Sequence, residues 1–491
     1  EADVSSGLPC FTMVGFPSTQ VKEAQDRVRT ALKNNGISLP PKKVTVNLAP
    51  ADLRKEGAGF DLPVAAAVLA ASGFIEPQLL RNVMVVGELS LNGEVRSVSG
   101  VLPRVIRARE LGCRYCIIPF ENLAEGALVK DMKVVGVQNI KEVLKLVSDP
   151  DAFGKENQFS EVNSEENQIE ESLVDFGEIC GQESARRAAE IAVSGFHNIL
   201  FIGPPGTGKT MLAKRIPTIM PSLTFEESLE LTKIYSIAGL LSPKRPLIKA
   251  RPFRSPHHTS SSAALAGGGR IPGPGEVTLA HRGVLFLDEM PEFARGSLEV
   301  LRQPLEDKQI QLSRASGTYV FPAGFILVAA MNPCPCGYYP DMNKCRCTPG
   351  EVSHYLHKLS QPLLERIDLC ADVPPVNFSQ ISEEKSGESS ALIRKRVEKA
   401  RRIQQKRYQN EKICFNGELS GKQIRKYCVL TENAFQVAKN AFELMELSAR
   451  SYHRILKVSR TIADMEGEEL IHTRHVAEAL TYKAFDKKYR S

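Results

Sequence analysis

The segment that restricts the fold most is the run Gly-Pro-Pro-Gly-Thr-Gly-Lys-Thr, which has the spacing G-x-x-x-x-G-K-[ST]. It follows an apolar run at 198–202 and precedes a helical pattern that starts near residue 210, and this is the context of a phosphate-binding loop. Glycines let backbone N–H groups approach phosphate oxygens, the lysine reaches the β- and γ-phosphates, and the threonine hydroxyl binds Mg²⁺. We therefore expect an α/β domain that binds ATP and Mg²⁺ through Gly203, Pro204, Pro205, Gly206, Thr207, Gly208, Lys209 and Thr210.

A second apolar run, at 284–287, ends in two carboxylates. If this run is a strand beside the phosphate-binding loop, Asp288 belongs to the Mg²⁺ shell. Glu289 then orients and polarises the attacking water. The same pattern alone also fits a strand that ends in a solvated turn. The functional interpretation of the two carboxylates therefore depends on the presence of the phosphate-binding loop.

Hydrophobic periodicity divides the chain into four parts. Residues 1–150 alternate strand and helix patterns, with strands expected at 11–14, 44–48, 83–87 and 115–119 and helices at 20–34, 61–71 and 102–110. Residues 151–174 are acidic and poor in apolar side chains, which predicts a flexible linker. Residues 175–375 contain apolar runs at 199–203, 283–288 and 324–331 that suit buried parallel strands, and residues 376–491 have a helical pattern.

Composition excludes several classes of protein. The chain has 491 residues with 42% hydrophobic content, which is ordinary for globular domains and excludes disorder throughout, a collagen-like fibre and a small disulfide scaffold. The longest apolar run, at 62–75, is short and interrupted by Pro63 and Gly73, so we expect no membrane span. The net charge of +6 permits a nucleic-acid partner without establishing one.

The cysteines and the first residues indicate the compartment and the start of the chain. Eleven cysteines are an odd number and no secretory segment precedes them, so we expect a reducing compartment and a cytoplasmic protein.

Glu1 is followed at once by strand-like sequence without an initiator Met. Either the chain was processed or the first strand of the domain is missing, and we expect the second.

Further motifs narrow the interpretation. They are Phe-Arg-Ser-Pro-His-His-Thr at 253–259, Gly-Gly-Gly at 267–269, Pro-Gly-Pro-Gly-Glu at 272–276, Leu-Ala-His-Arg-Gly at 279–283 and Leu-Arg-Gln-Pro-Leu-Glu at 301–306. Together with the phosphate-binding loop they resemble the magnesium-chelatase-like clade of AAA+ ATPases, and within it the YifB/ComM competence-type proteins. The resemblance covers nearly the whole chain. It implies a homo-hexameric ring with ATP sites between subunits and a C-terminal helical lid.

The resemblance also assigns roles to residues outside the loop. Asn332 matches the sensor 1 position, which contacts the γ-phosphate or the water. Arg366 matches the arginine finger that enters the neighbour's site and stabilises charge on the transferred phosphoryl group. Arg450 matches sensor 2, with Arg454 as a nearby alternative.

Four cysteines crowd together in a C-x-C…C-x-C arrangement. Cys334, Cys336, Cys345 and Cys347 could supply four thiolates to a structural zinc ion, and His354 or His357 could replace one of them. Four reduced thiols in an ordinary loop remain the alternative.

The first domain resembles the proteolytic domain of Lon proteases, which use a Ser–Lys dyad. The segment expected to carry the serine reads Gly57-Ala58-Gly59, and the segment expected to carry the lysine contains Arg104 instead. Arginine stays protonated and cannot act as the base. We therefore expect an α+β domain of this fold without its peptidase chemistry.

Two functions remain open. The resemblance implies a DNA motor of the branch-migration or helicase type, supported by a basic stretch at 394–407 and by a His257-His258 segment that is either a pore-facing hairpin or a surface loop. The alternative is a chelatase-like or chaperone-like motor that remodels a protein partner. A scaffold with little ATPase activity is a third interpretation.

Overall fold

The computed structural model describes residues 1–148, 174–269, 272–314, 317–376 and 387–483. The chain forms two compact units. The first contains residues 1–167, 225–248 and 313–318, and the second contains 168–224, 249–312 and 319–491. The acidic segment expected as a linker lies outside the described residues, apart from Val174.

The second unit is built on a five-stranded parallel sheet of order β10-β13-β16-β9-β17. Its strands are β9 (Ile199–Ile202), β10 (Phe253–Arg254), β13 (Val284–Leu287), β16 (Ile326–Met331) and β17 (Leu369–Asp372). The three expected apolar strands are confirmed as β9, β13 and β16. An α/β fold with a parallel sheet is therefore confirmed for this unit.

Both faces of this sheet are buried at its three central strands, β13, β16 and β9, which is why these strands are apolar throughout. On β9, Ile199 and Phe201 belong to one hydrophobic core, and Leu200 and Ile202 belong to the other. The first core is completed by α8 (Glu183–Gly195), α9 (Lys209–Ile219), α18 (Ser390–Arg407), α21 (Ala449–Glu466) and α22 (Thr473–Thr481). The second core is completed by α11 (Ser262–Ala266), α12 (Glu276–Leu279), α13 (Arg295–Glu299), α14 (Arg302–Asp307), α15 (Pro349–His357) and α16 (Gln361–Leu364).

The described residues from 249 onward also contain two short hairpins. They are β11 (Gly267–Gly268) with β12 (Gly273–Pro274), and β14 (Gln309–Arg314) with β15 (Gly317–Pro322).

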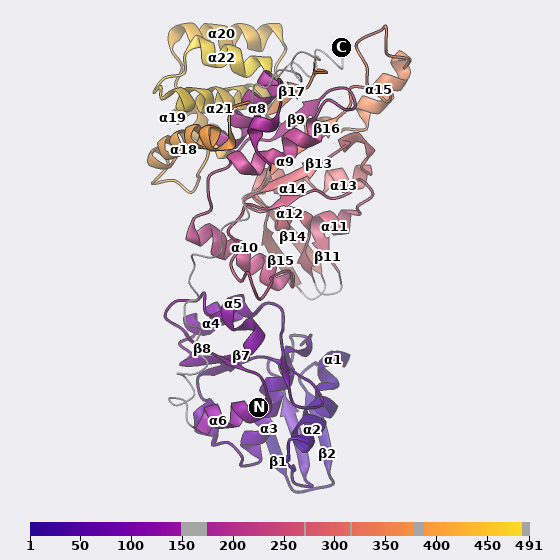
Figure 1. The fold of residues 1–491 in the computed structure, drawn as a ribbon, viewed down its shortest axis with the longest axis vertical. Coiled ribbons are helices and arrows are strands. Elements are labelled where there is room, and N and C mark those ends of the chain that lie inside the picture. The colour runs from indigo at the N-terminus through magenta and orange to yellow at the C-terminus, as the bar shows by residue number, and fades with distance from the viewer. Residues whose placement is uncertain (149–173, 270–271, 315–316, 377–386, 484–491) are drawn as a thin grey trace. The chain divides into compact units, whose positions relative to one another are not determined.

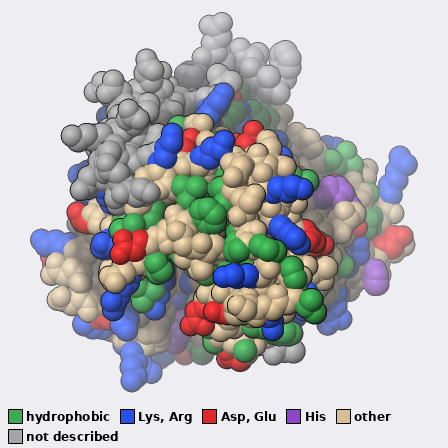
Figure 2. Space-filling view, turned by 90° about the horizontal axis from the view of Figure 1, so that it is seen from below, with side chains coloured by type: hydrophobic (Ala, Val, Ile, Leu, Met, Phe, Trp, Pro, Cys, Tyr) green, Lys and Arg blue, Asp and Glu red, His purple; other side chains and the backbone are tan. Residues whose placement is uncertain are grey.

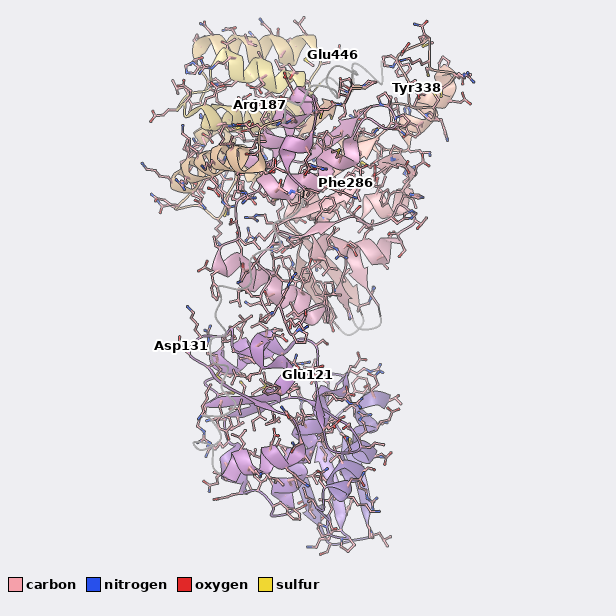
Figure 3. The ribbon with its side chains drawn as sticks, in the orientation of Figure 1. Glu121, Asp131, Arg187, Phe286, Tyr338 and Glu446 are labelled. Carbon is pink, nitrogen blue, oxygen red and sulfur yellow. The ribbon has the colours of Figure 1, made fainter. Side chains whose placement is uncertain are left out.

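The C-terminal helices gather at one side of the second unit, with α15 at the opposite side (Figure 1). They are α18, α19 (Gly421–Tyr427), α20 (Glu432–Leu444), α21 and α22. A buried charge network joins them, because Arg460 and Asp464 are fully buried and Arg407 donates to Asp464 at 2.8 Å. Arg187 on α8 donates to Glu478 on α22 at 2.8 Å (Figure 3), which links these helices to the sheet layer.

The first unit contains two three-stranded sheets and one two-stranded ladder. Its strands are β1 (Ala2–Ser5), β2 (Cys10–Val14), β3 (Lys43–Asn47), β4 (Val83–Val85), β5 (Glu88–Leu89), β6 (Val95–Arg96), β7 (Tyr115–Pro119) and β8 (Lys133–Val137). Its helices are α1 (Thr19–Lys22), α2 (Ala24–Asn34), α3 (Asp61–Ala71), α4 (Val101–Glu110), α5 (Leu123–Gly126), α6 (Ile140–Ser148) and α10 (Phe225–Ile237). The four expected strands and three expected helices are present, although the first helix is interrupted at Glu23.

Helix α10 belongs to the first unit, although its sequence lies inside the range 175–375. The Gly100 N–H at the start of α4 donates to the Ser236 carbonyl near the end of α10 at 2.9 Å. Leu229 of α10 packs against the apolar cluster of α4 and β7. The first unit is therefore completed by a segment from far along the chain.

No helix within the described residues is long and apolar enough to cross a membrane. On the face shown in Figure 2, Lys and Arg side chains are spread among hydrophobic and acidic ones.

We predict that Phe286→Ala destabilises the second unit by about 3–5 kcal/mol, because a buried aromatic side chain is lost and a cavity remains. Phe286 is 1% exposed and its ring stacks on Phe253 with centroids 5.8 Å apart (Figure 3). Denaturant unfolding followed by circular dichroism measures the change. Val320→Ala, at a side chain that is 56% exposed, is the control and should change stability by less than about 0.5 kcal/mol.

Candidate functional site

The phosphate-binding loop connects β9 to α9, as its sequence predicts. Gly206 and Gly208 have φ angles of +76° and +89°, a left-handed conformation that side chains disfavour. A Cβ added at either glycine would meet nothing within 4 Å, so the loop presents open backbone there. At Gly203, by contrast, a Cβ would lie 2.1 Å from the Val373 carbonyl oxygen, which makes glycine necessary for packing.

Lys209 lies at the centre of this loop. Its ammonium donates to the carbonyls of Gly203 (2.7 Å) and Pro204 (2.8 Å) and to Asn332 Oδ1 (3.0 Å). Burial lowers the pKa of Lys209, and the nearby carboxylates of Asp288 and Glu289 oppose that effect. The structure thus brings together the lysine, at the start of α9, and the expected sensor residue, directly after β16.

The expected magnesium ligands also converge. Thr210 Oγ1 donates to Asp288 Oδ2 at 2.7 Å, which places a hydroxyl and a carboxylate side by side at the end of β13. Oxygen donors of this kind are the ligands that Mg²⁺ prefers. The Glu289 N–H donates to Asp288 Oδ1 at 3.0 Å, and the residue has a φ of +49°. These residues fit ATP with Mg²⁺.

Arg366 and Arg450 lie elsewhere and share a cavity of about 710 Å³ in the second unit. Its lining combines many basic side chains with acidic ones, and no residue of the loop 203–210 is among them. Arg366 donates to the Pro362 carbonyl at 2.6 Å and forms an ion pair with Glu306. Arg450 is exposed and lies 3.5 Å from Glu365.

Arg454, the alternative to Arg450, is used inside the fold. It is buried and donates to the Leu364 carbonyl at 3.2 Å and to the Ile367 carbonyl. These bonds hold the turn that carries Arg366. Arg450 is therefore the more available of the two arginines.

The four clustered cysteines converge on one point. Their Sγ atoms all lie within 4.8 Å of one another, and no other group of potential metal ligands of this kind occurs among the residues described. The Cys334 Sγ accepts backbone N–H bonds from Gly337 (3.2 Å) and Tyr339 (3.4 Å). His354 and His357 are not members of this cluster.

The basic stretch 394–407 separates into two groups on α18. Arg394, Arg396 and Arg407 donate to Thr218, Glu190 and Asp464, and the Arg401 guanidinium lies 5.0 Å from the Phe415 ring centroid. These four side chains stabilise the fold. The exposed remainder, with successive spacings of four, three and four residues on one helix face, is Lys395, Lys399, Arg402 and Lys406.

The His257-His258 segment follows β10 as a turn. The two rings lie 4.1 Å apart, and His257 Nδ1 is 2.9 Å from Thr259 Oγ1.

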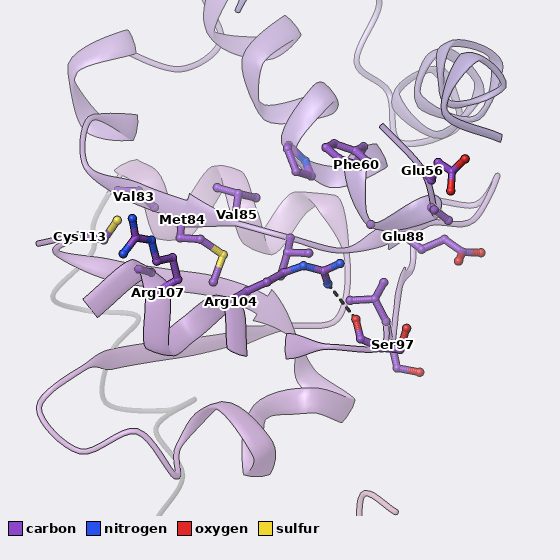
Figure 4. A pocket seen from close by; sticks show the side chains of 18 of the residues that line it. Glu56, Phe60, Val83, Met84, Val85, Glu88, Ser97, Arg104, Arg107 and Cys113 are labelled. Atoms are coloured by element: carbon purple, nitrogen blue, oxygen red, sulfur yellow. Dashed lines mark hydrogen bonds between the residues drawn. The ribbon is translucent and has the colours of Figure 1, made fainter. Parts of the chain in front are cut away.

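The first unit contains a cavity of about 610 Å³ lined by the segment around Ala58 and by Arg104 (Figure 4). Arg104 donates to the Ser99 carbonyl at 2.8 Å, and its guanidinium is 3.9 Å from the position of a Cβ added at Gly59. No lysine lines this cavity among the described residues. The arginine therefore occupies the place where the dyad's lysine was expected.

Sequence reasoning missed Gln182 near the nucleotide loop. Its amide donates to the Pro374 carbonyl at 2.6 Å and to the Thr207 carbonyl at 3.4 Å, joining the loop to the chain after β17. Its φ of +56° is unusual for a residue with a side chain. A Gly-Gln pair immediately before a helix is a weak signal that could have drawn attention to it.

Family models match three successive parts of the chain. Residues 1–122 match "Subunit ChlI of Mg-chelatase", residues 175–381 match "Magnesium chelatase, subunit ChlI" and residues 387–483 match "Magnesium chelatase, subunit ChlI C-terminal". The three matches together span nearly the whole chain.

Some curated relatives are similar over almost their full length, and others over a short segment. The competence protein ComM of Haemophilus influenzae is 44% identical over 99% of this chain and 94% of its own. The uncharacterized protein YifB of Escherichia coli is 43% identical with the same coverage. The DNA repair protein RadA of Halalkalibacterium halodurans is 32% identical over 23% of this chain and 24% of its own. The chain therefore belongs to the magnesium-chelatase-like AAA+ family, in the group of ComM and YifB.

Proposed function

We propose that this chain is an ATP-hydrolysing ring motor, a homo-hexamer that acts on single-stranded or branched DNA in helicase-type or branch-migration reactions of recombination or natural transformation. The observation that carries the ATPase part is the convergence of Lys209 with Asn332 and of Thr210 with Asp288 at neighbouring strand ends. Lys209 and Thr210 begin α9, whereas Asp288 directly follows β13 and Asn332 directly follows β16.

Each residue has a distinct part in the proposed reaction. Lys209 neutralises the terminal phosphates and Thr210 with Asp288 holds Mg²⁺, which shields the phosphate charge. Glu289 orients the attacking water and Asn332 senses the terminal phosphate. The division separates residues that bind ATP in the ground state from residues that act on the water.

The ring is supported by the position of Arg366 and Arg450. Both line a cavity to which the nucleotide loop of the same chain contributes nothing. An arginine in this cavity that assists ATP hydrolysis therefore acts on a nucleotide bound to a neighbouring copy of the chain. The C-terminal helices that carry Arg450 then form the lid of that arrangement.

DNA as the partner is supported by the exposed face of α18, defined by Lys395, Lys399, Arg402 and Lys406. Four cations on one helix face suit the spaced phosphates of a nucleic-acid backbone. The names of the relatives ComM and RadA point in the same direction. The chelatase name of the family models supports the alternative, a motor that remodels a protein partner.

Three further assignments accompany this proposal. The first unit is a Lon-protease-like domain without peptidase activity, because Ala58 and Arg104 replace the dyad. The four clustered cysteines hold a structural zinc ion. The free thiols described for the chain favour a reducing compartment, the cytoplasm.

We predict that Lys209→Ala weakens ATP binding at least about tenfold, because charge-assisted bonds to phosphate are lost. Glu289→Gln should retain ATP binding and lower hydrolysis by about 100-fold or more, because it removes the group that acts on the water. Fluorescent-nucleotide titration and phosphate release measure the two effects. Equal loss of binding in both variants would contradict the division of roles.

Mixing of two inactive variants tests the ring. Arg366→Ala subunits keep the nucleotide loop, and Lys209→Ala subunits keep the arginine. In mixed rings some interfaces combine both intact parts, so phosphate release should exceed that of either variant alone. Absence of recovery, with mixed assemblies demonstrated by native mass spectrometry, would place Arg366 in its own subunit's chemistry or in a structural role.

DNA stimulation separates the two candidate functions. We expect single-stranded or branched DNA to raise the rate of ATP hydrolysis. In a variant that lacks phosphate contacts, the steepness of log DNA affinity against log salt concentration should fall by about one for each contact removed. The test variant is Lys395→Gln/Lys399→Gln/Lys406→Gln. The matched control removes three exposed charges of the first unit, Lys22→Gln/Lys33→Gln/Lys141→Gln. No effect of any DNA on binding or rate at low salt would favour a protein partner.

A further inference from the structure

The cysteine cluster lies in the chain between the candidate sensor residue Asn332 and helix α15. Asn332, whose side chain receives a bond from Lys209, precedes Cys334 by two residues. At the other end, Thr348 directly follows Cys347 and caps α15, because its Oγ1 accepts the Glu351 N–H at 3.3 Å. Tyr355 of α15 belongs to the same buried core as Met331 and Cys334, on either side of Asn332. The segment 334–347 is thus anchored at its start beside the nucleotide loop and at its end by α15.

The same segment packs directly against that loop. Gly337 has a φ of +88°, and a Cβ added there would lie 2.5 Å from Pro205 Cδ and 3.0 Å from Pro205 Cγ. Only a glycine allows this close approach of backbone to the proline ring. Tyr338 and Tyr339 form one wall of a cavity of about 410 Å³ whose other walls include Gly203 and Pro204. A change in the cysteine segment therefore reaches the nucleotide loop by contact.

The sulfur positions suit a tetrahedral metal. Four sulfurs at about 2.3 Å from one zinc ion lie about 3.8 Å from one another. The Sγ distances are 3.8 Å for Cys334–Cys345, 3.6 Å for Cys336–Cys345 and 3.3 Å for Cys334–Cys336. The N–H bonds to Cys334 from Gly337 and Tyr339 are the kind of outer bonds that orient metal-binding thiolates. Gly337 thus touches both the cluster and Pro205.

We propose that zinc in the four-cysteine site positions the ATP-binding loop, so that metal binding and nucleotide binding strengthen one another through Gly337 and Pro205. The proposal rests on ATP binding at the loop 203–210 and adds to it a metal dependence. Four thiolates fixed by one ion hold Gly337 against Pro205 and hold Asn332 within reach of Lys209. Without the ion the segment loses this constraint while its anchors at Asn332 and Thr348 remain.

Thermodynamic linkage makes the proposal measurable, because two ligands that are coupled change each other's affinity by the same factor. We expect zinc removal to weaken binding of a non-hydrolysable ATP analogue about tenfold, the size of one charge-assisted bond. We expect the same analogue with Mg²⁺ to raise zinc affinity about tenfold in chelator-buffered titrations of the full chain. A merely structural metal would show no such reciprocity.

Three variants distinguish an effect of the contact between Gly337 and Pro205 from an effect of unfolding. Cys345→Ser/Cys347→Ser should lose zinc and bind the analogue about tenfold more weakly, whereas Cys10→Ser, at an exposed cysteine of the first unit, should leave both unchanged. Gly337→Ala keeps all four cysteines, so it should retain zinc while the analogue no longer raises zinc affinity. Thermal unfolding of each variant confirms that the comparison is made between folded proteins.

The outcomes are distinct. Zinc near one equivalent per chain together with reciprocal linkage that Gly337→Ala removes supports the inference. Analogue binding that is indifferent to zinc, or protein purified under reducing conditions without zinc, overturns the inference and leaves the ATPase proposal intact. Failure of the wild-type chain to bind the analogue at all overturns both.

Discussion

The bond between the Lys209 ammonium and Asn332 Oδ1 is the contact at the centre of the candidate nucleotide site. It joins the loop after β9 to the end of β16, while the same ammonium satisfies two carbonyls of its own loop. A buried cation needs such partners, because desolvation favours its neutral form. Burial accordingly lowers the pKa of Lys209, and the two carboxylates of β13 counteract it. A phosphate group placed there would supply the negative charge that this cation lacks.

Much of the site was predictable, because its residues sit at fixed offsets from strands that must be buried. Asp288 directly follows an apolar run, Lys209 and Thr210 lie at fixed positions in the loop that follows another, and parallel strands end at a common edge. The helix at 61–71 and the strand at 115–119 were predicted at the residues observed, because each is an apolar run with clear flanks. Local pattern determines local structure in these cases.

The remainder depends on contacts between distant residues. The pattern of α10 identifies a helix but cannot reveal that its partner is α4, more than 100 residues earlier, or that it clusters with the first unit. The basic stretch of α18 looks uniform in sequence. Burial of Arg394 and Arg407 against Thr218 and Asp464 distinguishes them from their exposed neighbours only in the folded chain.

The cysteines extend this reasoning to the nucleotide loop. C-x-C spacing alone leaves zinc and free thiols equally open, because adjacent ligands can point apart. Convergence of four sulfurs within 4.8 Å changes the chemistry, since four thiolates repel one another unless a cation lies among them. Gly337 makes two contacts that matter here. Its N–H donates to Cys334 Sγ, and its backbone lies close to the Pro205 ring. In our proposal, a metal that holds the first contact also holds the second, so its binding acts on the loop through backbone packing.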